Sequence, residues 1–122
     1  MQSDYQTLMD KLGYTFRNPR LLEKALTHSS YANEGKHGGE SNERLEFLGD
    51  SVLGFVAAKY LFEKETGPEG ELTKLRAAVV CEKALCSYSQ ELGLGDYLLL
   101  GKGERLTGGA ERPSILADAF EA

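Results

Sequence analysis

The sequence predicts an all-α domain. Apolar residues recur at helical spacing in about six separate stretches, and no stretch shows the alternation of apolar and polar residues that is typical of a half-buried strand. The three prolines and several of the glycines fall where these helical stretches begin and end. The 122 residues are 41% hydrophobic and 27% charged, so we expect residues 1–122 to form one domain with a single core.

Two helices are predicted near the N-terminus. Apolar residues within 5–12 repeat at i, i+3, i+4 and i+7, and Gly13 follows as a C-terminal stop. Asn18 and Pro19 are typical of the cap and the first residue of a second helix. The apolar face of this second helix runs toward His28, and the sequence does not fix its end.

The longest helix is predicted in the middle of the chain. Residues 31–41 form a polar loop that contains glycines. Ser41 or Asn42 then caps a third helix, which we expect to continue to a turn at Gly67 and Pro68.

Three more helices complete the expected set. They cover residues 70–80, residues 82–92 with a stop at Gly93, and a last stretch that Pro113 opens. A glycine-rich connection over 95–113 precedes the last of them. That last helix shows neither a glycine stop nor a basic last turn, so we expect the chain to be a fragment of something longer.

Composition excludes several classes of protein. The N-terminus resembles no secretory signal, and no stretch approaches the roughly 18 apolar residues of a membrane span, so we expect a cytoplasmic protein that does not contact membranes. Cys81 and Cys86 lie five residues apart, which matches neither a zinc site nor a redox pair, and we interpret both as reduced core thiols. The formal net charge of −5 argues against binding nucleic acid by bulk charge alone; a divalent metal would supply positive charge.

The segment "NERLEFLGD", residues 42–50, places Glu43, Glu46 and Asp50 on one stripe of the third helix. Like charges at these spacings destabilise a helix by a few tenths of a kcal/mol per pair, and a cation, a basic partner or solvent could offset that cost. Phe47 lies on the same polar side, near Gly54, where it suits an interface with a partner or packing against another helix of this domain; both alternatives stay open. Four apolar residues lie opposite the stripe: Leu45, Leu48, Val52 and Phe55.

A second acidic pair, Asp118 and Glu121, lies at i, i+3 on the last helix. Two helices that each offer carboxylates one turn apart suit a hard cation, and all-oxygen ligation favours magnesium or manganese. A solvated acidic face is the simpler alternative. Neither histidine follows a glutamate at the spacing of a di-iron bundle, no P-loop motif is present, and His28 beside Ser29 lacks a nucleophile elbow.

Four segments together are similar to one known family. "LTHSSYANE", "NERLEFLGDSVL", "EGELTKLRA" and "GGAERPSILADAFEA" occur in this order along nearly the whole chain, and together they resemble the endonuclease domain of bacterial ribonuclease III. The resemblance implies an all-α domain that forms a symmetric homodimer. It also implies a metal-dependent hydrolase that cuts double-stranded RNA, in ribosomal RNA and other structured RNA, and leaves 5′-phosphates, 3′-hydroxyls and short 3′ overhangs.

The resemblance further implies which residues act. The family's catalytic metal ligands, for Mg²⁺ with Mn²⁺ able to substitute, map onto Glu46, Asp50, Asp118 and Glu121. Glu43 matches a further acidic residue of the same motif, and Glu69 matches one that lines the cleavage valley from the partner subunit. Phe47 matches the family's dimer anchor.

Departures from the family pattern leave alternatives open. The family's last helix continues past "ADAFEA", and a double-stranded RNA-binding domain usually follows; neither is present in these 122 residues. The chain could therefore be an active endoribonuclease, or a catalytically silent dimerisation or RNA-docking module derived from one. A compact ribonuclease III variant that naturally lacks the RNA-binding domain is the third alternative.

Overall fold

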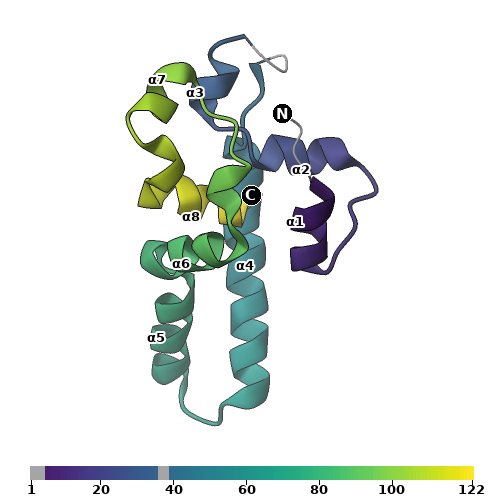
Figure 1. The fold of residues 1–122 in the computed structure, drawn as a ribbon. Helices are drawn as coiled ribbons and strands as arrows, with labels where there is room; N and C mark the ends of the chain where they lie inside the picture. The colour runs from purple at the N-terminus through teal and green to yellow at the C-terminus, as the bar shows by residue number, and fades with distance from the viewer. Residues whose placement is uncertain (1–4, 36–38) are drawn as a thin grey trace.

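The chain is described by a computed structural model over residues 5–35 and 39–122, and within these ranges it is all-α (Figure 1). The expected fold class is confirmed. The extended contacts in these ranges amount to one isolated parallel bridge between Thr27 and Leu99. No helix in the described part of the chain is both long and apolar enough to cross a membrane. The expected loop over 31–41 is described only in part, because residues 36–38, His37 among them, lie outside the described residues.

The N-terminal helices begin and end where local signals predict. Helix α1 (Tyr5–Leu12) ends before Gly13, whose φ of 70° is easily reached only by glycine. The Asn18 side chain accepts a hydrogen bond of 3.1 Å from the backbone N–H of Arg20, which caps α2 (Pro19–Ala25).

The remaining helices include the four that the sequence predicts and two short ones that it does not. The predicted helices are α4 (Glu43–Lys64), α5 (Glu69–Val80), α6 (Glu82–Leu92) and α8 (Pro113–Glu121). The two further ones in the described ranges are α3 (Ser29–Ala32) and α7 (Lys102–Leu106). The short 3₁₀ turns η2 (Leu94–Asp96) and η3 (Gly109–Glu111) flank α7 in the chain.

The core lies where α6 and α8 pack together, with α1 and α2 beside them. Its buried side chains come from both ends of the chain, among them Leu8, Leu26, Leu98 and Leu116, each 3% exposed or less. Helix α8 also packs across α4, whereas α5 lies antiparallel along the other half of α4 (Figure 1). The long helix α4 thus joins the core to a two-helix arm.

The apolar side of α4 is not covered by the rest of the chain. Leu48, Val52 and Phe55 are 59%, 52% and 66% exposed, and Phe47 is 80% exposed. Complete burial of such a side chain contributes about 1.5–3 kcal/mol, so covering this side of α4 with a partner would be considerably stabilising. We call the exposed side chains Leu48, Val52, Phe55 and Val56, together with Phe47 on the side nearer the acidic stripe, the α4 apolar face.

The two cysteines differ in their surroundings. Both are free, but only Cys86 is buried, in the core on α6. The prediction that both are core thiols is wrong for Cys81, which is exposed because it lies at the break between α5 and α6 and not on a buried helix face.

Candidate metal centre

The site begins with a close crossing of two helices. Helix α8 meets α4 at Gly49, and a Cβ atom at that position would overlap the backbone carbonyl of Glu121. Gly49 lies in the interior of α4, where glycine costs up to about 1 kcal/mol relative to alanine. The missing side chain therefore serves a packing purpose: it lets the last turn of α8 lie directly against α4.

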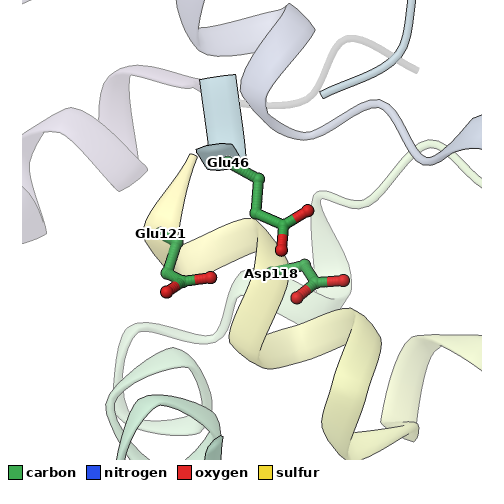
Figure 2. Close-up of side chains that lie close together, drawn as sticks. All are labelled: Glu46, Asp118 and Glu121. Atoms are coloured by element: carbon green, nitrogen blue, oxygen red, sulfur yellow. The ribbon is translucent and has the colours of Figure 1, made fainter. Parts of the chain in front are cut away.

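This crossing brings carboxylates from both helices together (Figure 2). Glu46 comes from α4, and Asp118 and Glu121 come from α8, one turn apart. One carboxylate oxygen from each of the three lies within 4.8 Å of the others. Oxygen atoms at this separation, held by rigid helices, form a ligand set that suits a hard divalent cation.

Two further acids border these three. The side chain of Asp50 forms a hydrogen bond with Glu121, and Asp118 forms one with Glu46. Glu43 lies close enough for its charge to act on Glu46. We call Glu46, Asp50, Asp118 and Glu121 the acidic cluster. A hydrogen bond between two carboxyl groups requires a proton on one of them, which agrees with the raised pKa values of Glu46 and Glu121.

The electrostatics of the cluster are unfavourable for four ionised carboxylates. Partial burial, and then the hydrogen bond and charge of Asp118, raise the pKa of Glu46 from 4.5 to about 7. Burial, and then the hydrogen bond and charge of Asp50, raise the pKa of Glu121 from 4.5 to about 7. None of the ion pairs found in the described ranges joins a lysine or an arginine to these four acids. A cation would replace the missing positive charge.

The raised pKa values predict how the stability of the metal-free chain depends on pH. In the unfolded chain both glutamates titrate near 4.5, and in the folded chain near 7, so the folded state binds more protons between these pH values. The free energy of unfolding contributed by this pair is therefore present below pH 4.5 and is lost as pH rises through 7. Urea unfolding at pH 5 and pH 8 in EDTA measures this contribution.

The control for this measurement is Glu121→Gln, which removes one titrating carboxyl group and leaves the other titrating groups of the chain in place. We expect the wild-type chain to lose more stability than this variant between pH 5 and pH 8, and added Mg²⁺ at pH 8 to restore the loss in the wild-type chain. An equal pH dependence in the two proteins would contradict the raised pKa of Glu121.

Other predicted residues lie outside the cluster. Phe47 follows Glu46 directly and points its ring to solvent, being 80% exposed. Glu69 is the first residue of α5, beside Phe62 at the far end of α4, and so lies away from the cluster of its own chain. His28 caps α3, where its Nδ1 accepts a hydrogen bond of 3.1 Å from the backbone N–H of Ser30, so it has a structural role.

Sequence reasoning missed two residues that shape this region. Gly49 stands between Leu48 and Asp50 inside a predicted helix, and its helix-breaking tendency was the available signal of a close approach. Ser41 or Asn42 was expected to cap α4: the Ser41 hydroxyl does accept from the backbone N–H of Glu43, whereas the Asn42 side chain makes no capping bond and instead donates to the backbone carbonyl of Ala25. No sequence pattern signals that contact, because the two residues are 17 positions apart.

Comparisons with known proteins agree with this arrangement. The family model described as Ribonuclease-III-like matches residues 18–122. Ribonuclease 3 of Bacillus cytotoxicus is 58% identical over 120 residues, which cover 97% of this chain and 49% of that protein, and Ribonuclease 3 of Bacillus cereus (strain AH187) is 56% identical over the same coverage. The chain thus spans about half the length of these relatives.

Two solved structures are similar as well. Both are of the nuclease domain of ribonuclease III from Campylobacter jejuni. One, described for flexibility in a region involved in dimer formation, has a TM-score of 0.89 and 46% identity and covers 97% of this chain and 80% of that one. The other has a TM-score of 0.86 and 44% identity over 99% of this chain and 79% of that one.

Proposed function

Since this chain belongs to the ribonuclease III family, we propose that it is a metal-dependent endoribonuclease domain that hydrolyses phosphodiester bonds in double-stranded RNA. The products carry 5′-phosphates, 3′-hydroxyls and short 3′ overhangs, and the substrates are ribosomal and other structured RNA in the cytoplasm. The observation that carries the proposal is the acidic cluster, formed by two helices that cross at Gly49.

The cluster residues have the chemistry that such a reaction needs. Glu46, Asp118 and Glu121 present oxygen ligands to one point, and Asp50 is hydrogen-bonded to Glu121 at its edge. Mg²⁺ is the proposed ion, with Mn²⁺ able to substitute, because both prefer oxygen ligands. A bound divalent cation supplies Lewis-acid chemistry: it polarises a phosphate and lowers the pKa of water.

The chain's own part is to bind, to orient and to hold protons. The raised pKa values of Glu46 and Glu121 favour their protonated forms, and these two carboxyl groups would lose their protons on binding a cation, because carboxylate ligands bind deprotonated. With pKa values near 7, the two glutamates exchange protons easily at neutral pH. Glu43, beside Glu46, adds negative charge that strengthens cation binding.

Low sequence specificity follows from the composition of the site. Double-stranded RNA is recognised mainly through its shape, its phosphates and its 2′-hydroxyl groups. The acidic cluster offers oxygen ligands to a metal and no side chains suited to reading base edges. With a formal net charge of −5, the chain should bind RNA weakly and with a steep dependence on salt.

A symmetric homodimer is the second part of the proposal. The α4 apolar face is exposed in one copy and would be buried against its counterpart in a second. Dimer formation by the similar nuclease domain from Campylobacter jejuni supports this. In such a dimer Glu69, which lies far from its own cluster, is proposed to line the cleavage valley next to the cluster of the partner.

The test of the proposed function uses the purified chain and a long labelled RNA duplex in low salt. We expect Mg²⁺-dependent cutting of the duplex, no cutting in EDTA, and no cutting of single-stranded RNA of the same sequence. A folded dimer that leaves the duplex intact at every Mg²⁺ concentration would contradict nuclease activity and favour a silent docking module.

Phe47→Ala tests the dimer separately from the chemistry. Removing an exposed aromatic anchor from the centre of an interface typically costs at least 2 kcal/mol, so we expect the dimer dissociation constant to rise at least about thirtyfold. Sedimentation velocity across a concentration series measures the change. Leu106→Ala, at an equally exposed position on α7, is the control and should leave association unchanged; an equal effect of both substitutions would reject the anchor role of Phe47.

A further inference from the structure

The start of α4 is held in an unusual way. Asn42 occupies the position just before α4, yet its side chain makes no capping bond to the helix. Its Nδ2 donates instead to the backbone carbonyl of Ala25 on α2, at 2.9 Å, and its backbone N–H donates to the carbonyl of Thr27, also at 2.9 Å. Asn42 is 6% exposed, so both hydrogen bonds are shielded from water.

The N-terminus of α4 is capped by Ser41 and not by Asn42. The hydroxyl of Ser41 accepts a hydrogen bond of 3.3 Å from the backbone N–H of Glu43. The amide of Asn42 is thus free to act over a long range, between two segments 17 residues apart. The two hydrogen bonds of Asn42 thus link the start of α4 to α2 and to Thr27 just after it.

Apolar packing between α2 and the start of α4 is incomplete. A cavity of about 440 Å³ lies where α1, α2 and the end of α8 meet the first turn of α4, and its lining includes Leu22 and Ala25 of α2 and Leu45 of α4. Beside this space, the two hydrogen bonds of Asn42 join the start of α4 to Ala25 at the end of α2 and to Thr27 just after it. Losing them would leave that turn free to shift.

That first turn carries Glu43 and Glu46. The backbone N–H of Glu46 donates to the carbonyl of Asn42 at 2.8 Å, so Glu46 sits one helical turn from the clamp. The segment that holds Asn42 is itself fixed on its other side: Leu99 donates to the carbonyl of Leu26 at 2.9 Å and accepts from the N–H of His28 at 3.0 Å. The clamp therefore ties the start of α4 to the chain that leads to α8.

We propose that Asn42 is a positioning residue for the cation site: through its bonds to Ala25 and Thr27 it sets where Glu46 presents its carboxylate to Asp118 and Glu121. This inference rests on the proposed function, because it assigns Asn42 a role in the same site. Groups that orient metal ligands from outside the ligand set typically change metal affinity by about 10–100-fold when removed.

The test measures Mn²⁺ binding directly, by the loss of the free Mn²⁺ signal in electron paramagnetic resonance at pH 8. Asn42→Ser removes the reach to Ala25 but keeps a side chain that starts helices equally well. We expect it to weaken Mn²⁺ binding about tenfold and to cut duplex RNA at low Mn²⁺ more slowly, with cutting restored at high Mn²⁺. Ser41→Ala, which removes only the local cap, is the matched control and should bind Mn²⁺ as the wild-type chain does.

A second variant covers the case in which the serine protein does not fold. Asn42→Asp keeps the size of the side chain and its capping ability, but a carboxylate cannot donate to Ala25. Its added negative charge would by itself strengthen cation binding, so weaker Mn²⁺ binding by this variant, with a circular dichroism spectrum that matches the wild-type chain, is the result expected from displacement of Glu46.

The outcomes separate this inference from the function on which it rests. Folded Asn42 variants that bind Mn²⁺ as tightly as the wild-type chain, even with a lower melting temperature, would reduce Asn42 to a purely structural residue and overturn the inference. A wild-type chain that binds no Mn²⁺ would instead contradict the proposed function, and the positioning role would fall with it.

Discussion

Glu121→Gln is expected to abolish duplex cleavage while raising the stability of the metal-free chain above pH 7. The substitution removes one carboxylate from the acidic cluster, and a loss of several kcal/mol of metal-based transition-state stabilisation corresponds to a rate decrease on the order of 10³-fold or more. The same change relieves repulsion, because the pKa of Glu121 is raised to about 7 by burial and by Asp50. Single-turnover cleavage and urea unfolding at pH 8 measure the two effects.

This prediction is specific because the cleavage rate is expected to fall while the stability of the metal-free chain rises. A substitution that merely damages the fold lowers both activity and stability. Glu91→Gln makes the same chemical change at an exposed position on α6, away from the cluster, and should alter neither quantity. Cleavage by Glu121→Gln at the wild-type rate would show that Glu121 is not a ligand.

Gly49→Ala is expected to displace α8 and to disable the site without touching a carboxylate. The new methyl group would overlap the backbone carbonyl of Glu121, and backbone cannot rotate away as a flexible side chain can. Overpacking of this kind costs about 1–3 kcal/mol, more than the gain of up to about 1 kcal/mol from replacing a helical glycine. A shift of 1 Å in a catalytic group can reduce the rate about a hundredfold, so we expect a large loss of cleavage with a moderate loss of stability.

Gly54 offers a control on the same helix. A Cβ atom at Gly54 would meet nothing within 4 Å among the described residues, so Gly54→Ala should keep or slightly increase the free energy of unfolding of the single chain. The interpretation of Gly54 as a point of approach for a partner stays a prediction. If Gly49→Ala were as stable and as active as Gly54→Ala, the close crossing would have no functional importance.

Local signals predicted most of the fold. Gly13 and Gly93 end helices at positive φ, and Asn18 with Pro19 begins one, because these residues act through their own backbone geometry. The helices α3 and α7 were not predicted, since each is short and depends on distant contacts. The N–H of Lys102, at the start of α7, donates to the side chain of Glu34 at 2.7 Å, for example, and no local pattern contains that bond.

The candidate site was predicted in part. The acidic stripe and the pair Asp118 and Glu121 could be seen in the sequence, and the family resemblance supplied their proposed roles. The pairing of Glu46 with Asp118, and the raised pKa values, depend on how α8 crosses α4, which sequence spacing does not determine. For the same reason periodicity showed an apolar side on α4 but could not show that the chain leaves it exposed.

Glu46 and Phe47 are adjacent residues of one helix, so only about 100° of helical rotation separates a proposed metal ligand from the proposed dimer anchor. Both residues lie on α4, so no loop separates the proposed metal ligand from the proposed dimer interface. In the proposed symmetric dimer, the two α4 helices would therefore hold the two metal sites at a fixed separation. If the chain cuts duplex RNA as proposed, the offset between the cuts on the two strands would be set by this separation and would be the same for duplexes of any sequence.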